Sequence, residues 1–220
     1  MIPVEEKLQG RYVALAGVEL EGGWDEWPEN DRIDIGSDGS VRADAPHVGE
    51  IRTAPLPPGQ MLRLVPEIYP DEVNKTCGLH LHMSFRSLVS YGALCEDEFW
   101  PFLSGRLEVW GERANIKNPE FWARLRGENN YCSNSCKGPY RRQQTRATDR
   151  GDVRYAPVNY CWGLHKTVEV RVLPMFKRPE VAVTALRQVL NATDEWIHDR
   201  RVIRRTTRPI LHTRAELEVE

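Results

Sequence analysis

The sequence of 220 residues contains no long hydrophobic run, because no apolar stretch approaches the roughly 20 residues that a helix needs to cross a bilayer. Its first residues, MIPVEEKLQG, are polar and acidic, so we expect no secretory signal peptide. Cysteine is scarce: five residues at irregular spacings do not suggest a disulfide framework. These absences predict a cytoplasmic protein with reduced thiols and no membrane association.

The chain also lacks a strong net charge, internal repeats and linkers rich in glycine or serine. Its formal net charge of −2 gives no overall attraction to nucleic acid or anionic membranes. Its content of 40% hydrophobic and 28% charged residues is typical of folded globular proteins. We therefore expect a single domain over residues 1–220, with a core at about 11–200 and a C-terminal tail at 206–220.

Positive charge is concentrated in two stretches of the chain. Residues 137–150 carry five basic side chains and one acidic one, and residues 200–208 carry five arginines. Either stretch fits an ordinary solvated surface or a phosphate-binding segment, and composition does not decide between them. The first belongs to a polar segment, 127–150, whose length indicates a functional or disordered loop.

Hydrophobic periodicity predicts a mixture of strands and helices. The expected strands lie at 12–22, 32–43 (a hairpin turning at Asp38-Gly39), 48–55, 77–85, 154–161 and 167–173. The expected helices lie within 57–72, 96–112 and 118–126, with a long helix from Pro179 whose apolar stripe is Ala182, Leu186, Val189, Leu190, Thr193, Trp196 and Ile197. Because there is no regular βαβ alternation, we expect an α+β fold with a mainly antiparallel sheet.

One expected strand, CGLHLHMSF at 77–85, carries two histidines on its polar side. Its leucine, methionine and phenylalanine residues share one parity, whereas His80, His82 and Ser84 share the other. Ordinary solvent-facing strands carry Thr, Lys or Glu at such positions. The pair of histidines fits either a polar strand satisfied by hydrogen bonds or a functional site.

Three other expected strands carry carboxylates on their polar side: Glu19 and Glu21, Glu50, and Glu169 with Arg171. Taken singly, each is typical of a solvent-facing strand or a surface ion pair. If the four strands join one sheet in register, however, one face gathers carboxylates that repel one another unless a cation neutralises them. A set rich in carboxylates, with one or two imidazoles, suits Mg²⁺ or Mn²⁺ better than Zn²⁺.

These motifs resemble those of the glutamine synthetase catalytic fold. GLHLHMSF is similar to its G-x-H-x-H-x-S strand, TVEVRVLP to its E-x-R strand and GVELEG to its E-x-E strand. The order of the motifs, with DGS at 38–40 and RYAPVN at 154–159, is closer to the amidoligase family of carboxylate–amine ligases, over roughly residues 11–175. The resemblance implies a curved sheet with helices on one face and an ATP-dependent ligase that forms an amide through an acyl phosphate.

The resemblance also implies roles for individual residues. The metal ligands would be Glu19, Glu21, Glu50, His80 and Glu169, with His80 on the metal that bridges the ATP phosphates. The nucleotide would lie against His82, Ser84, Arg154 and Asn159. The catalytic residues would be Arg171, Arg154 and Glu50: Arg171 would hold the substrate carboxylate or the phosphoryl group in transfer, Arg154 would steady phosphate charge, and Glu50 would act as a carboxylate ligand. The cofactors would be ATP with Mg²⁺ or Mn²⁺, and the substrates a small-molecule or peptide carboxylate and an amine, with nucleic acid only as a modified substrate.

The chain departs from the synthetase pattern in two respects. Thr167 stands two positions before the E-x-R glutamate, where the synthetase has an additional arginine. The first acidic strand begins about a dozen residues into the chain, so we expect no counterpart of the N-terminal domain with which the synthetase completes its site. Ammonia as the amine, and a large ring assembly, are therefore not implied.

Other functions fit the same residues. A metal-dependent phosphoester hydrolase would use the acidic face without ATP, and a non-catalytic module would hold a nucleic acid or a protein through the arginine-rich segments. Cys132, Cys136, Cys161 and His165 offer donors for zinc but lack the usual C-x₂-C pairs. A catalytic cysteine is another alternative, and small buried residues beside a loop are the simplest interpretation.

Overall fold

The computed structural model describes residues 11–129, 132, 156–161 and 166–206, with only the backbone at 88, 89, 91 and 202–206. The strands are β1 (Val13–Trp24), β2 (Ile33–Gly36), β3 (His47–Thr53), β4 (Gly78–Phe85), β5 (Val158–Cys161) and β6 (Thr167–Pro174). The helices are α2 (Pro58–Leu64), the 3-10 turn η1 (Val65–Ile68), α3 (Leu88–Leu94), α4 (Phe99–Arg113), α5 (Pro119–Arg126) and α7 (Pro179–Thr206). None of these helices has the length and hydrophobicity needed to cross a membrane.

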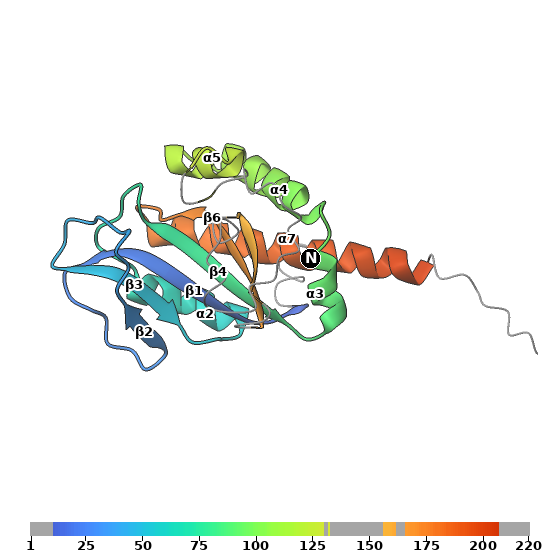
Figure 1. Cartoon of the computed structure of the whole chain (residues 1–220), viewed down its shortest axis with the longest axis horizontal. Coiled ribbons are helices and arrows are strands. Elements are labelled where there is room, and N and C mark those ends of the chain that lie inside the picture. The colour runs from blue at the N-terminus through green and yellow to red at the C-terminus, as the bar shows by residue number, and fades with distance from the viewer. Residues whose placement is uncertain (1–10, 130–131, 133–155, 162–165, 207–220) are drawn as a thin grey trace, which may run out of the picture.

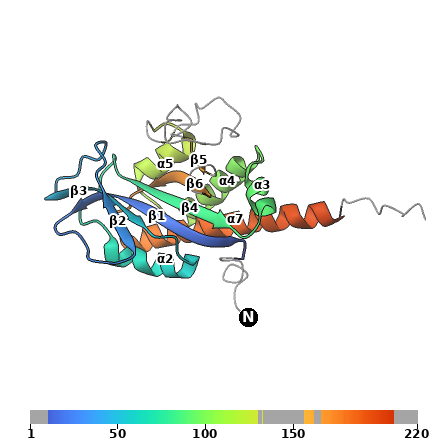
Figure 2. The same ribbon diagram turned by 60° about the horizontal axis from the view of Figure 1, so that its bottom comes forward.

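The six strands form one curved sheet in the order β2-β3-β1-β4-β6-β5, with every neighbouring pair antiparallel (Figures 1 and 2). β1 is the longest strand and pairs with β3 along one edge and with β4 along the other. The expectation of an α+β fold built on an antiparallel sheet is therefore confirmed.

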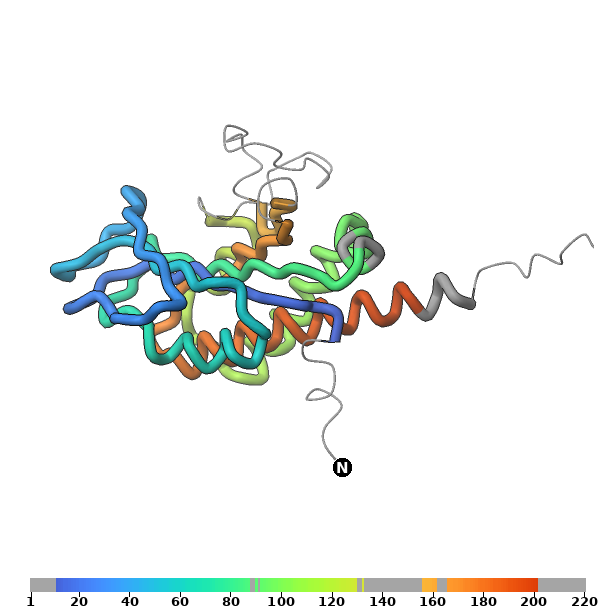
Figure 3. The backbone as a smooth tube through the Cα atoms, turned by 90° about the horizontal axis from the view of Figure 1, so that it is seen from below, coloured from blue at the N-terminus to red at the C-terminus, as the bar shows by residue number. Residues whose placement is uncertain are grey.

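One face of the sheet is apolar and is covered by helices. Val18, Leu81 and Val170 on three neighbouring strands are essentially inaccessible to solvent, as alternation along each strand predicts. α2 and α7 lie on the same side of the sheet (Figure 3). The stripe expected from Pro179 onward is buried along α7, which confirms the prediction of a long amphipathic helix.

β6 contains one residue more than β4 where the two strands pair. Leu79 lies opposite Leu173 and Leu81 opposite Val170, so two steps along β4 correspond to three along β6. An extra residue in one strand of a pair is a β-bulge, which interrupts the alternation of faces. Val172 and Leu173 are consequently both buried, although they are adjacent in the chain.

The predicted hairpin within 32–43 is wrong. Asp38 does form a turn, in which its carboxylate accepts a hydrogen bond from the Ser40 N–H at 2.7 Å. The chain does not return along β2 from that turn, because Val41 enters the core instead. It returns as β3, where Ile51 lies opposite Ile35.

α7 and the beginning of β1 are joined by a buried carboxylate. Asp194 on α7 is inaccessible to solvent and accepts hydrogen bonds from three successive backbone N–H groups. The distances are 2.8 Å from Arg11, 2.9 Å from Tyr12 and 3.3 Å from Val13. A single side chain thus satisfies the backbone donors of the two residues before β1 and of its first residue.

Candidate metal site

The polar face of the sheet carries a continuous row of ionisable and amide side chains. In the strand pairings Glu50 lies opposite Glu21, Glu19 opposite His80, and His82 opposite Glu169. Across the sheet the row consists of Glu50 (β3), Glu21 and Glu19 (β1), His80 and His82 (β4), Glu169 (β6) and Asn159 (β5). The structure thus brings together polar side chains of the four strands on which the sequence predicted them, and adds Asn159 of β5, which only the resemblance implied.

Glu19 lies between the two histidines. Its Oε2 atom is 3.0 Å from Nδ1 of His80, and its Oε1 atom is 3.2 Å from Nε2 of His82. His80 is the more deeply buried of the two imidazoles and also comes within 3.7 Å of Glu21 and of Glu169. Each histidine therefore faces more than one carboxylate.

Glu169 is buried and has a cation on one side and an amide on the other. Nη1 of Arg171 donates to its Oε1 atom at 2.7 Å, and Nδ2 of Asn159 donates to its Oε2 atom at 3.0 Å. The imidazole of His82 lies 3.9 Å from Oε1. Such partners hold the carboxylate in one orientation.

Glu21 is fixed by the beginning of β4. The backbone N–H of Gly78 donates to its Oε2 atom at 2.6 Å. A Cβ atom at position 78 would lie 2.5 Å from Nε2 of His80 and 3.1 Å from Oε2 of Glu21. Glycine is therefore required at the first position of the G-x-H-x-H motif, because a side chain would collide with the histidine and the carboxylate.

The carboxylates of Glu19 and Glu169 are held in the ionised form. Burial alone would raise the pKa of Glu19, but hydrogen bonds to His80 and His82 hold this pKa far below its usual range. Burial would likewise raise the pKa of Glu169, but the charge of Arg171 and those of the two histidines lower it. The row therefore presents negative charge at neutral pH.

Two other groups bind protons more tightly than usual. Burial would lower the pKa of His82, but its hydrogen bond with Glu19 and the charge of Glu169 raise it overall. Burial, followed by the charge of Glu19, raises the pKa of Glu50, although Arg52 acts in the opposite direction. At these two positions a bound metal cation would supply the positive charge that tighter proton binding supplies in the metal-free protein.

Two groups of three side chains have ligand atoms close enough to share a metal ion. Glu19, His82 and Glu169 form one group, in which the ligand atoms lie within 4.8 Å of one another. Glu21, Asp38 and Glu50 form the other, under the same limit. Both are rich in oxygen donors, as Mg²⁺ and Mn²⁺ prefer.

Asp38 is the member that the sequence does not predict. The sequence indicates only a turn at Asp38-Gly39, and the resemblance implies only that the DGS segment precedes the second acidic strand. The turn places this carboxylate beside Glu21 and Glu50. The predicted ligand His80, in contrast, belongs to neither metal-compatible group within the described residues, although its ring nitrogens lie within 3.7 Å of Glu19, Glu21 and Glu169.

Two buried polar atoms beside the row fit a bound ligand. The described residues provide no hydrogen-bond partner for Oδ1 of Asn159 or for Nε of Arg171. One of these atoms is an acceptor and the other a donor, and both belong to residues that hold Glu169. Buried polar groups rarely remain without partners, so the residues present fit a metal with an anionic ligand beside it.

The remaining predicted site residues lie further from this cluster or outside the described part. Ser84 is half-buried and donates to the Leu15 carbonyl oxygen at 3.3 Å. Arg154, Cys136, His165 and the basic segment 137–150 lie outside the described residues. Cys132 and Cys161 are buried, with Sγ atoms 3.9 Å from the Arg124 carbonyl oxygen and 3.8 Å from Oε2 of Glu169, respectively. No cysteine belongs to either metal-compatible group within the described residues.

Comparison with known proteins gave no match to a family model, to a curated protein or to a solved structure.

Metal binding to the first group is expected to strengthen as the pH rises. His82 must be neutral to bind a metal, and its pKa is raised in the metal-free protein, so a proton competes with the metal. Below that pKa, the affinity for Mn²⁺ should fall by up to about tenfold for each unit of pH. Above it, the dependence on His82 should disappear.

This prediction can be checked by calorimetric titration of the metal-free protein with MnCl₂ between pH 6 and pH 8.5, in buffers with different ionisation enthalpies. Binding should release protons at the low end of the range. In the absence of metal, the stability of the fold should instead decrease as the pH rises. Protonated His82 stabilises the folded protein fully below about pH 6.5, and this contribution is lost as the pH rises through its raised pKa in the folded state. An affinity that is independent of pH would show that His82 is not a ligand.

Proposed function

We propose that the protein is an ATP-dependent carboxylate–amine ligase that forms an amide bond through an acyl phosphate. The observation that carries the proposal is the group of Glu19, His82 and Glu169, whose ligand atoms lie within 4.8 Å of one another on one sheet face, with Arg171 bonded to Glu169. The resemblance of the strand motifs to the amidoligases supports the same chemistry.

A divalent metal ion fits this face, and Glu19, His82 and Glu169 would hold one ion and Glu21, Asp38 and Glu50 a second. When bound, such ions neutralise the charge of phosphate oxygens and align them for transfer. His80 would keep the carboxylates around it oriented, since it contacts three of them. Whether it also binds metal, as the resemblance implies, stays a prediction.

Arg171 is suited to hold the reacting anion. One of its nitrogens is bonded to Glu169, while its buried Nε has no hydrogen-bond partner among the described residues. A buried guanidinium whose Nε–H group is available as a donor can bind a substrate carboxylate or a phosphoryl oxygen. Burial would lower the pKa of Arg171, but the charges of Glu169, Glu19 and Glu21 raise it overall, so Arg171 is cationic throughout the physiological range.

The proposed reaction has two steps. An oxygen of the substrate carboxylate attacks the γ-phosphorus of ATP, so that a new C(=O)O–P bond forms and ADP leaves. The neutral amine nitrogen then attacks the acyl carbon, an amide C–N bond forms, and inorganic phosphate leaves with the former carboxylate oxygen. The amine releases one proton to solvent, and Glu50 serves in the second metal group rather than as the proton acceptor, because a bound cation lowers the proton affinity of a carboxylate.

A coupled assay of ADP release tests the proposal directly. The full chain would be incubated with ATP and MgCl₂ against a panel of carboxylates, including amino acids and short peptides, crossed with a panel of amines, including amino acids and polyamines. We expect ADP release that depends on both a carboxylate and an amine, and a condensed product that has lost one water in mass spectrometry. The same assay with EDTA should show no turnover.

The rival functions give different results in the same assay. Metal-dependent release of phosphate from a phosphoester without ATP would favour a hydrolase. Binding of nucleic acid that weakens steeply with salt, without any ATP turnover, would favour a non-catalytic module. A broad panel that yields no amine-dependent ADP release would count against a ligase.

A further inference from the structure

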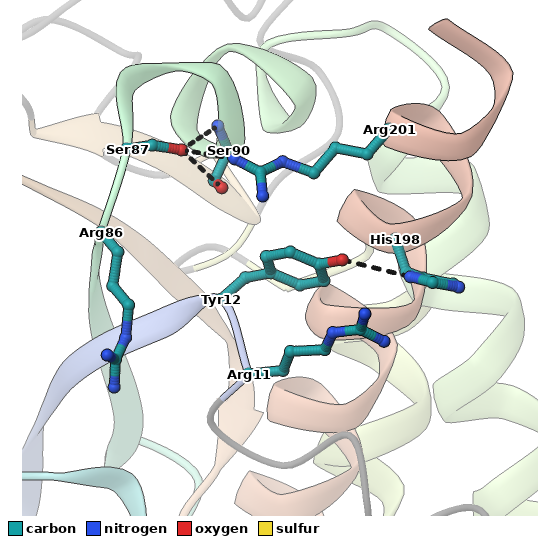
Figure 4. A pocket seen from close by; sticks show the side chains of 7 residues that line it. All are labelled: Arg11, Tyr12, Arg86, Ser87, Ser90, His198 and Arg201. Atoms are coloured by element: carbon teal, nitrogen blue, oxygen red, sulfur yellow. Dashed lines mark hydrogen bonds between the residues drawn. The ribbon is translucent and has the colours of Figure 1, made fainter. Parts of the chain in front are cut away.

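A second concave site lies at the opposite end of β4 from Gly78. It is a pocket of about 270 Å³ where the beginning of β1, the residues after β4, α3 and the last part of α7 meet (Figure 4). Its lining includes Arg11, Arg86 and Arg201, and no acidic residue of the described chain contributes to it. The pocket is thus opposite in charge to the acidic row.

The three arginines lack an ion-pair partner in the part of the chain that the structure describes. Within the described residues, no carboxylate forms an ion pair with any of them. Arg200, the neighbour of Arg201 on α7, does find a carboxylate, because its Nε lies 2.9 Å from Glu96. Three cations around one pocket repel one another unless an anion lies between them.

Two of the guanidinium groups are held in place by one aromatic ring. The guanidinium carbon of Arg201 lies 5.0 Å from the centre of the Tyr12 ring, and that of Arg11 lies 5.3 Å from it. The Tyr12 hydroxyl is bonded to Nδ1 of His198 at 3.1 Å (Figure 4). Asp194 accepts hydrogen bonds from the backbone N–H groups of Arg11 and Tyr12, so the side of the pocket that these two residues form is held in position before any ligand binds.

Two hydroxyl groups complete the polar lining. Arg201 donates to Oγ of Ser87 at 2.9 Å, and this oxygen is 3.0 Å from Oγ of Ser90 (Figure 4). Ser90 is almost completely buried. Guanidinium and hydroxyl groups are the donors with which proteins bind phosphate oxygens, and Arg201, Ser87 and Ser90 bring both kinds together here.

We propose that this pocket binds a phosphate group, either free or as part of a small phosphorylated molecule. Its volume is slightly below the roughly 300 Å³ at which pockets for larger organic ligands begin, and therefore suits a small anion. A dianionic phosphate neutralises more of the charge of three arginines than one carboxylate would. The pocket is separate from the metal row, because Arg86 is four residues beyond His82, about 13 Å along a strand.

The test uses the full chain in EDTA without ATP, so that its result does not depend on the ligase proposal. Thermal unfolding and isothermal titration calorimetry would be recorded with inorganic phosphate, with glycerol phosphate, with succinate and with chloride at matched ionic strength. We expect saturable stabilisation by phosphate or by the phosphate ester, and little from succinate or chloride. The tighter of the two phosphate probes shows whether the ligand is the free ion or an ester.

Variants locate the binding. Arg86→Gln, on an exposed side chain, and Arg201→Lys, which keeps the charge but loses the planar fork, should each weaken phosphate binding about tenfold or more. Arg187→Gln, at an exposed position of α7 outside the pocket, is the matched control and should bind as the parent does. Unchanged affinity in both pocket variants, loss of phosphate binding in Glu169→Gln instead, or equal binding of succinate would overturn the proposal.

Discussion

Replacement of Glu169 by glutamine is expected to lower the rate of ADP release by about a thousandfold. Glutamine keeps the size of the side chain and one carbonyl oxygen, but it removes the negative charge that a divalent ion requires at this position. The loss should appear mainly in kcat, with a weaker affinity for Mn²⁺. Both quantities can be measured by the coupled assay and by titration with MnCl₂.

The same substitution should also destabilise the metal-free protein, by about 2 kcal/mol. Glu169 and Arg171 form a buried pair at 2.7 Å, and breaking such a pair outright costs roughly 3–5 kcal/mol. The expected loss is smaller because the amide oxygen can still accept from Arg171 and because repulsion from Glu19 is relieved. Activity must therefore be measured well below the unfolding temperature of the variant.

Glu108→Gln is the matched control, since Glu108 is exposed on α4 and belongs to neither metal-compatible group. It should retain both the activity and the stability of the parent. If Glu169→Gln remained folded and turned over at the parental rate, the assignment of the acidic row as the reaction site would be wrong.

Replacement of Asp194 by asparagine is expected to lower the free energy of unfolding by about 3 kcal/mol. Its two carboxylate oxygens accept from the N–H groups of Arg11, Tyr12 and Val13, and hydrogen bonds to charged groups contribute about 1.5–3 kcal/mol each. In asparagine one oxygen becomes an NH₂ group, which cannot accept a hydrogen bond. At least one buried donor would then lose its partner.

Urea unfolding measures this loss, and Asp199→Asn, at an exposed position of the same helix, provides the control. The control should lie within about 0.5 kcal/mol of the parent. Because Asp194 also fixes the backbone of Arg11 and Tyr12, the variant should bind phosphate more weakly in the arginine pocket. A variant of parental stability would show that β1 is anchored by other contacts.

The alternation of side chains was sufficient to place most of the candidate site. Glu19, His80 and Glu169 were expected on the polar sides of their strands, and the pairings bring them to one face. Parity is a local property with a period of two residues, so a single sequence reveals it. That the four strands belong to one sheet was only a hypothesis, supported by the resemblance, until the strand order was known.

Features that depend on long-range pairing or on short elements were missed. The turn at Asp38 indicates a local hairpin, but the partner of β2 is β3. No local sequence pattern predicts the pairing of β2 with β3. α3 has only seven residues, too few for a periodic signal to stand out. The bulge in β6 also escaped detection, because the strict alternation of TVEVRV predicts a regular strand up to Val172.

The arginine pocket could not be foreseen for a related reason. Arg11, Arg86 and Arg201 belong to three segments that are distant in the sequence, and no local motif indicates that these arginines share a binding site. The arginine-rich stretch at 200–208 was identified, but only as either solvated surface or phosphate-binding chain. Tertiary structure decides which of its arginines meets the others.

The order of the strands has a consequence for how the chain is made. During synthesis β1, β3 and β4 emerge first and can pair, whereas β6, the other neighbour of β4, follows only after α3, α4 and α5. Until then β4 is the edge of a nascent sheet, and the backbone groups along its open side remain available to other chains. We therefore expect fragments that end before Thr167 to aggregate. We also expect a chaperone to assist this protein during the interval between the synthesis of β4 and that of β6.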